Sequence, residues 1–262
     1  MPYADQISPA VERIPLSLIL ISILAGLAML RLFGAVSRPD AIRAAKRRMQ
    51  ARLLELRLFG DEPALVWRAQ AGLLTANLLY LRVMLIPIAV VAVPTLLVFP
   101  HLDAIYGRAP LPVGAATMLT LHLRAPFGGS LPQPRIVAPS GLRVETAAVR
   151  VPAEREISWE LSADGPVSQP VRIEFGGMAV SKVVRTIHAG GYLAQSATAS
   201  PLGWLVNPGE ALIGGASVDW IRVEYRRMRY SLGEWELPWE AWFLVISMVA
   251  AVAGKIYWRV VF

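Results

Sequence analysis

The chain has 262 residues, a formal net charge of +7 and no cysteine. The lack of cysteine excludes disulfides and thiolate catalysis, but it leaves the compartment open, because an oxidising space permits disulfides without requiring them. Hydrophobic residues make up 55% of the chain. They concentrate in three long runs, so the composition points first to a membrane protein.

Three apolar runs are long enough to cross a bilayer, which needs about 20 residues of helix. They cover residues 15–33, 83–100 and 238–258. The first run follows a tail, residues 1–14, that lacks a basic cluster. Because this run is longer than the apolar core of a signal peptide, we expect it to be a retained transmembrane span.

The distribution of Lys and Arg predicts the orientation of the three spans. Residues 34–82 contain nine basic and four acidic residues, so this segment is expected in the cytoplasm. Residues 1–14 are then outside and residues 259–262 inside. Residues 101–237 lie outside the cytoplasm, and their thirteen basic and twelve acidic residues nearly cancel. The excess charge faces the cytoplasm, which favours anionic lipid over nucleic acid as its partner.

The segment of residues 34–82 predicts a basic helical hairpin. Apolar residues recur every three or four positions over residues 39–59, residues 60–63 break the pattern, and residues 63–82 form a second arm. The candidate contacts to anionic lipid or to a partner are Arg43, Lys46, Arg47, Arg48 and Arg52. The hairpin is either a docking platform for a partner or nascent chain, or a surface helix pair that orients the spans.

Aromatic residues flank the third apolar run at both ends. Trp and Tyr are enriched where a membrane meets water, because their rings are partly apolar and partly polar. We therefore predict interfacial anchors at Trp235, Trp239, Trp242, Tyr257 and Trp258.

Residues 101–237 change character, with short β-branched runs between Gly, Pro and Asn turns. A spacing of roughly ten residues predicts an immunoglobulin-like β-sandwich. Gly176-Gly177 predicts a hairpin turn within it. The aromatic and basic strand at residues 217–230 either contacts acidic partners or headgroups, or is a solvated strand face. The predicted fold is therefore an α+β membrane protein with three transmembrane helices, a cytoplasmic helical hairpin and an extracytoplasmic β-sandwich domain.

No set of residues predicts catalysis or metal binding. The three histidines, His101, His122 and His188, have no second ligand at metal-binding spacing. His101 is a candidate ligand for a haem or a chlorophyll-type pigment, although contact with water or a headgroup is the favoured interpretation. The sequence thus predicts a non-enzyme with no catalytic, cofactor-binding or metal residues and with bound lipids, and it leaves pigment or haem contact open.

The hairpin arms at residues 43–59 and 64–82, separated by the break at residues 60–63, lie between the first two apolar runs. This order resembles the YidC-type insertase superfamily and its three-span relatives over residues 15–100. The resemblance implies a hydrophilic groove within the bilayer, for which Arg31 and Arg82 are the candidate arginines. A β domain before the third span departs from the small relatives.

The chain also resembles bacterial membrane proteins that have the same hairpin and a Trp-rich last span. That resemblance implies the bacterial inner membrane and no particular activity.

Three functions follow from these patterns. The first is a non-catalytic structural or accessory subunit of a larger inner-membrane complex, with other integral membrane subunits as partners. The candidate complexes are energy-transducing, respiratory or photosynthetic. The second is an insertase-like membrane-protein chaperone, which a water-accessible groove between the first two spans would favour. The third is a stand-alone ligand-sensing membrane protein, which a concave aromatic pocket in the outer domain would favour.

Overall fold

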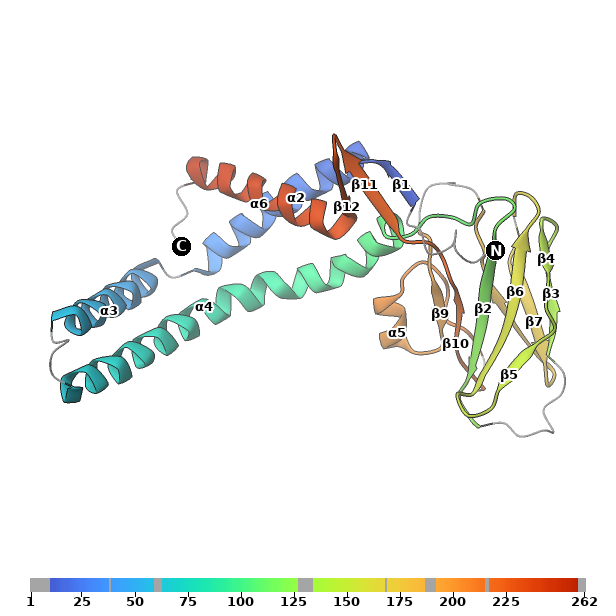
Figure 1. The fold of residues 1–262 in the computed structure, drawn as a ribbon, viewed down its shortest axis with the longest axis horizontal. Helices are drawn as coiled ribbons and strands as arrows, with labels where there is room; N and C mark the ends of the chain where they lie inside the picture. The colour runs from blue at the N-terminus through green and yellow to red at the C-terminus, as the bar shows by residue number, and fades with distance from the viewer. Residues whose placement is uncertain are drawn as a thin grey trace. The chain divides into compact units, whose positions relative to one another are not determined.

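A computed structural model describes residues 10–37, 39–58, 63–126, 134–167, 169–186, 192–214 and 217–258 (Figure 1). The fold is α+β, and the chain divides into two compact units. The sheet unit contains residues 10–15 and Leu97–Trp242, and the helical unit contains Leu16–Leu96 and the residues from Phe243 onward. His188 and the break at residues 60–62 lie outside the described residues.

Within the described residues, three helices are long and apolar enough to cross a membrane, as expected. The long helices are α2 (Leu16–Val36), α3 (Pro39–Leu58), α4 (Pro63–Tyr106) and α6 (Trp239–Trp258). The segments expected as a second hairpin arm and a second span form the single helix α4, which continues to Tyr106. At 1.5 Å per residue its 44 residues extend about 66 Å, roughly twice the thickness of a bilayer core.

A seam of every fourth residue on α2 packs inside the helical unit. The buried positions are Leu18, Ser22, Gly26 and Leu30. A Cβ at Gly26 would collide with the backbone carbonyl of Ser247 on α6, so glycine is what lets these two helices approach closely. Ser22 Oγ donates to the carbonyl of Leu18 at 2.6 Å, which satisfies this hydroxyl within its own helix.

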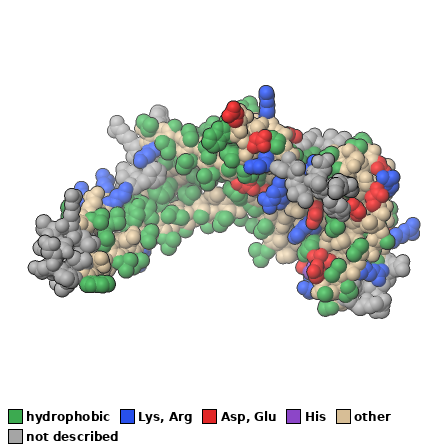
Figure 2. Space-filling model, viewed as in Figure 1, with side chains coloured by type: hydrophobic (Ala, Val, Ile, Leu, Met, Phe, Trp, Pro, Cys, Tyr) green, Lys and Arg blue, Asp and Glu red, His purple; other side chains and the backbone are tan. Residues whose placement is uncertain are grey.

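The rest of the helical unit exposes apolar side chains. Leu85 on α4 is 64% exposed and Leu96 is 71% exposed. Figure 2 shows hydrophobic side chains along the helices. Such a surface is unfavourable in water and suits hydrocarbon.

The largest sheet of the sheet unit has the strand order β4-β6-β2-β10-β9, with β5 also paired to β6. Its strands are β2 (Ala116–Leu123), β4 (Leu142–Val144), β5 (Val149–Val151), β6 (Glu156–Ala163), β9 (Ser196–Thr198) and β10 (Val218–Val223). Burial alternates strictly along β2, because successive side chains of a strand point to opposite faces. A register shift between Val218 and Trp220 interrupts the pairing of β10 with β2.

The second sheet has the order β3-β7-β8. Its strands are β3 (Arg135–Val137), β7 (Val171–Phe175) and β8 (Met178–Lys182). Strands β7 and β8 pair antiparallel around Gly176 and Gly177, which confirms the predicted hairpin turn. Both glycines have positive φ (54° and 77°), as a tight two-residue hairpin turn requires.

One hydrophobic cluster lies between these two sheets. Leu119, Leu121 and Trp159 come from the six-stranded sheet, and Ile173 and Val180 come from the second sheet. Two sheets that share one apolar layer are a stable way to bury a sheet face.

A third sheet joins strands from the two ends of the chain, in the order β1-β11-β12. Its strands are β1 (Ala10–Arg13), β11 (Met228–Leu232) and β12 (Trp235–Pro238). Strand β1 runs parallel to β11, with Ala10 opposite Met228. Helix α6 begins directly after β12, at Trp239.

Candidate functional site

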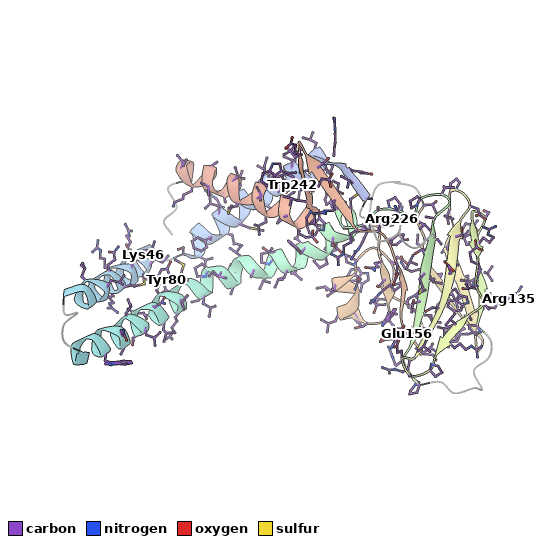
Figure 3. All side chains as sticks on the ribbon, viewed as in Figure 1. Lys46, Tyr80, Arg135, Glu156, Arg226 and Trp242 are labelled. Atoms are coloured by element: carbon purple, nitrogen blue, oxygen red, sulfur yellow. The ribbon has the colours of Figure 1, made fainter. Side chains whose placement is uncertain are left out.

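A pocket of about 530 Å³ lies at the root of the sheet unit, where α4 ends and α6 begins. This root pocket is lined by residues of four elements, among them Asp103, Arg226, Arg227, Arg229, Trp239 and Glu240. Its size is within the usual range for small-molecule sites. Figure 3 labels Arg226, which precedes β11.

Backbone hydrogen bonds hold the arginine-rich segment against the end of α4. The amide of Met228 donates to the carbonyl of Gly107 at 3.0 Å, and the amide of Ala109 donates to the carbonyl of Arg226 at 3.0 Å. A Cβ at Gly107 would collide with Asp103, so a larger residue does not fit at this turn. The segment is therefore fixed in position before any ligand arrives.

Asp103 and Trp239 form the floor of the root pocket. The Trp239 indole donates to Asp103 Oδ1 at 3.1 Å, and its ring centroid lies 4.8 Å from that of Phe99. Arg108 lies 3.9 Å from Asp103 Oδ2. These contacts fix one carboxylate of the pocket by an indole donor and a guanidinium.

The remaining charged groups are less completely paired. Arg229 donates to the backbone carbonyl of Glu236 at 3.0 Å. Within the part of the chain that the structure describes, the guanidinium groups of Arg226 and Arg227 have no hydrogen bond or ion pair, and buried Glu240 Oε2 has no donor. The pocket thus combines two guanidinium groups that have no partner among the described residues with the carboxylates of Asp103 and Glu240.

The predicted anchors at the start of α6 differ in exposure. Trp235 is 70% exposed, whereas Trp239 and Trp242 are buried. Trp242 Nε1 donates to the carbonyl of Tyr230 at 2.8 Å (Figure 3). Tyr257 and Trp258 belong to the last turn of α6, and their side chains lie outside the described part. Membrane anchoring stays a prediction for all five residues.

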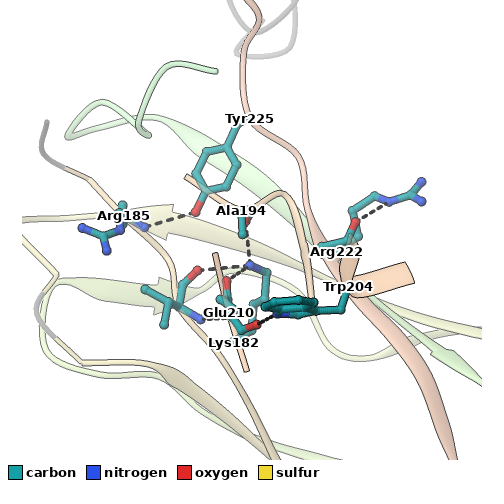
Figure 4. Close-up of polar contacts among 9 residues, drawn as sticks. Lys182, Arg185, Ala194, Trp204, Glu210, Arg222 and Tyr225 are labelled. Carbon is teal, nitrogen blue, oxygen red and sulfur yellow. Dashed lines mark hydrogen bonds and ion pairs between the residues drawn. The ribbon is translucent and has the colours of Figure 1, made fainter. Parts of the chain in front are cut away.

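A second polar cluster is buried in the sheet unit (Figure 4). Lys182 at the end of β8 is fully buried, pairs with Glu210 and donates to the carbonyl of Ala194 at 2.7 Å. The amide of Val183 donates to Glu210 Oε2, and the Trp204 indole donates to the backbone carbonyl of Glu210. Burial lowers the pKa of Lys182, and the charge of Glu210 opposes this effect. A buried, paired ammonium ties loops to the sheet and is inaccessible to a substrate.

Sequence reasoning missed Lys182, although its strand carried a signal. Met178, Val180 and Lys182 occupy alternate positions of β8, and a strand that is buried at Val180 also directs Lys182 inward. A lysine in the inward phase of a strand predicts a buried partner.

Tyr225, which follows β10 and lines the root pocket, is also buried. Its hydroxyl accepts from the amide of Arg185 at 3.1 Å. Burial raises the pKa of Tyr225 to about 12. Burial likewise raises the pKa of Tyr230, with a smaller contribution from Glu12, and the Tyr230 hydroxyl donates to the carbonyl of Tyr106 at 3.1 Å.

A third cluster lies on the outward side of the six-stranded sheet, and we call it the Trp220 face (His122, Asp219, Trp220 and Arg222). The rings of His122 and Trp220 are stacked, with centroids 5.1 Å apart, and the Arg222 guanidinium lies 4.5 Å from the Trp220 centroid. Asp219 lies 3.6 Å from His122 Nδ1. Arg222 Nε also donates to Ser196 Oγ at 3.3 Å. These contacts hold the four side chains in fixed positions relative to one another.

The two described histidines, His101 and His122, show no metal site. His101 Nδ1 lies 3.2 Å from the Tyr192 hydroxyl. Among the described residues, no group of three or more His, Cys, Asp or Glu side chains could hold a metal ion. Pigment or haem contact at His101 therefore stays a prediction without a second ligand.

Helix α3 carries the predicted basic cluster. Ile42 is fully buried, whereas Arg43, Arg47 and Arg48 are exposed, as expected of an amphipathic helix. Arg43 donates to Asp40 at 3.0 Å in the first turn. Lys46 is half-buried (Figure 3), and the side chain of Arg52 lies outside the described part. Lipid or partner contact by this cluster stays a prediction.

The helical unit has a groove of about 470 Å³ between α2, α4 and α6. Its lining includes Leu30, Phe33, Val91 and Leu96, and its one hydroxyl, Thr95 Oγ1, donates to the carbonyl of Val91 at 2.7 Å. This groove is apolar, unlike the hydrophilic groove that the insertase resemblance implies.

No family model matches the chain, and no curated protein or solved structure matches it either.

Proposed function

We propose that this chain is a non-catalytic accessory subunit of a larger inner-membrane complex. Its three apolar helices cross the bilayer and pack on partner helices. Its sheet unit, an immunoglobulin-like sandwich outside the cytoplasm, caps a partner, while the basic helical hairpin lies on the cytoplasmic side. The partner complex belongs to the energy-transducing, respiratory or photosynthetic class.

The Trp220 face is the observation that carries this proposal. Trp and Arg are the residue types that most often dominate binding energy in protein interfaces. Stacking with His122 and the cation–π contact with Arg222 hold Trp220 in place before binding, which reduces the entropy that binding costs. An ordered aromatic and basic face of this kind fits a protein surface better than a small molecule.

The helical unit gives secondary support. Leu85 and Leu96 are exposed on α4, and its candidate span, Gln70–Tyr106, buries only a small part of its side chains within the chain. A span with so little intramolecular packing leaves most of its surface to lipid and to helices of other subunits. The apolar lining of the groove favours this function over the insertase-like chaperone.

The test is recovery of partners after native membranes are solubilised in mild detergent. Affinity purification of the tagged full-length chain should recover a constant set of integral membrane proteins at fixed stoichiometry. Trp220→Ala should reduce their recovery by about tenfold or more, the loss typical of an interface hot spot. Far-UV circular dichroism and the thermal midpoint of the variant establish that it is folded.

Trp235→Ala is the matched control, because Trp235 is exposed on a different sheet. It should leave partner recovery unchanged. Migration of the wild-type chain alone, or with ribosomes and varied nascent chains, would rule the proposal out. Equal losses in the two Trp variants would remove the role of the Trp220 face.

A further inference from the structure

The root pocket lies at the level where two candidate spans end. Asp103 is in the last turn of α4, within the candidate span Gln70–Tyr106, and Glu240 is in the first turn of α6, within Trp239–Ile256. The inference that follows rests on the membrane location in the proposed function. Spans that cross the bilayer place these residues among the lipid headgroups.

The pocket supplies donors for a phosphate group. Arg226, Arg227 and Arg229 line it, and their backbone segment is fixed against α4 by the bonds of Met228 and Arg226. A guanidinium presents a planar fork of N–H donors that matches the oxygens of a phosphate. Arg226 and Arg227 have these donors unused among the described residues.

The pocket also supplies an acceptor for a cation. Glu240 lines the pocket and is half-buried, so its carboxylate offers an acceptor to a cation in the pocket. Asp103 is a second carboxylate in the lining, already held by the Trp239 indole. A purely anionic ligand would meet the two negative charges of Asp103 and Glu240.

From these two halves we infer that the root pocket binds a phosphoethanolamine group. The phosphate contacts Arg226 and Arg227, and the ammonium donates a hydrogen bond to Glu240. A phosphocholine group can make the phosphate contacts but not the hydrogen bond to Glu240, because its quaternary ammonium has no N–H donor. The chemistry therefore predicts a preference for phosphoethanolamine over both phosphocholine and phosphoglycerol headgroups.

The test is native mass spectrometry of the full-length chain in detergent, titrated with phosphatidylethanolamine, phosphatidylcholine and phosphatidylglycerol with identical acyl chains. Phosphatidylethanolamine should bind about tenfold more tightly than the other two, the ratio expected for one hydrogen bond between charged groups. Equal binding of the three lipids, or tightest binding of phosphatidylglycerol, would overturn the inference.

Variants test separately the arginines that contact the phosphate and the Glu240 carboxylate that sets the headgroup preference. Glu240→Gln should abolish discrimination between phosphatidylethanolamine and phosphatidylcholine, while both still bind. Arg226→Gln with Arg227→Gln should reduce binding of every phospholipid to the level of nonspecific attachment. Arg143→Gln with Arg172→Gln is the matched control, because both arginines are exposed elsewhere on the sheet unit. Discrimination that survives Glu240→Gln would contradict the inference.

Soluble glycerophosphoethanolamine distinguishes two sources of the same group. Much weaker binding than that of the lipid would assign the site to a membrane lipid, and equal binding would assign it to a soluble ligand. The titration uses the purified chain and needs no partner. Loss of headgroup preference with an intact complex therefore refutes only this inference, whereas loss of the complex with preference retained refutes only the proposed accessory role.

Discussion

The two units of the chain differ in how far they bury their apolar and charged side chains. The sheet unit buries Leu119, Leu121 and Ile173 completely and pairs the buried charge of Lys182 with Glu210. The helical unit leaves large apolar side chains such as Leu85 exposed. One unit is therefore stabilised by its own core, as in water, whereas the other needs hydrocarbon or partner helices to cover it.

The largest expected effect comes from breaking the buried ion pair of the sheet unit. Lys182→Met leaves the Glu210 carboxylate buried without its cation, and this should cost about 3–5 kcal/mol. Hydrogen exchange of the β8 amides in the full-length chain reports the change. The double variant Lys182→Met with Glu210→Gln should recover most of the loss, because no buried charge remains.

Arg172→Ala is the control for that experiment. It removes an exposed ion pair on the same sheet, with Arg172 Nε 3.8 Å from Glu174, and it should cost less than about 1 kcal/mol. A Lys182→Met variant as stable as this control would show that the buried pair does not hold the sheet unit together.

A matched pair of leucine truncations compares the two units directly. Leu161→Ala in β6 removes a fully buried side chain and should cost about 2–5 kcal/mol of unfolding free energy. Leu85→Ala in α4 should stay within about 0.5 kcal/mol in detergent, because that side chain contacts solvent or lipid in both states. Denaturant titration of each variant measures these costs, and equal costs would remove the distinction between the units.

Tyr225 makes the sheet unit sensitive to alkaline pH. Its pKa of about 12 exceeds the ordinary value of 10, so between pH 10 and 12 the folded chain keeps a proton that the unfolded chain releases. The stability that Tyr225 contributes should therefore be full below pH 10 and fall by about 1.4 kcal/mol per pH unit through this window. The raised pKa of Tyr230 acts in the same direction.

Lys182 has the opposite sign and does not interfere. Its lowered pKa makes stability rise with pH, and that rise is complete by the ordinary lysine value of 10.5. Tyr225→Phe should be less stable at neutral pH, since the amide of Arg185 loses its acceptor, but should lose less stability than the wild type above pH 10.5. Parallel pH profiles of the two proteins would contradict the burial of an un-ionised Tyr225.

The last comparison tests helix packing within the helical unit. Gly26→Val should separate α2 from α6, because a side chain at this position collides with the carbonyl of Ser247. Overpacking of this kind costs about 1–3 kcal/mol. Sodium dodecyl sulfate titration in mixed micelles measures the loss of helix packing. Ala28→Val, at an exposed position of α2, should have little effect.

Features that depend on local pattern were predictable from the sequence. The three apolar helices follow from run length, and the β7–β8 hairpin follows from two glycines between alternating strands. Features that depend on pairing across the chain were not. Strand β1 joins β11 through Ala10 and Met228, and no local pattern specifies a contact between residues so far apart.

The candidate site was only partly predictable for the same reason. The root pocket combines Asp103, Arg226 and Glu240, which come from separate elements, although the basic character of the segment around Arg226 was evident. Aromatic spacing marked Trp239 and Trp242 as membrane anchors, but spacing alone does not distinguish a ring facing lipid from one buried in protein. The structure shows both indoles bonded inside the sheet unit.

The accessory-subunit proposal rests on the transmembrane orientation of the chain, and the lack of cysteine makes this orientation directly measurable. Single variants Val149→Cys on β5 and Arg48→Cys on α3 place one thiol in each region, at exposed positions. A membrane-impermeant maleimide applied to intact spheroplasts should label the cysteine at position 149 at once and the cysteine at position 48 only after lysis. Labelling in the reverse order, or of both before lysis, would contradict a sheet unit outside the cytoplasm and a basic helix on the cytoplasmic side.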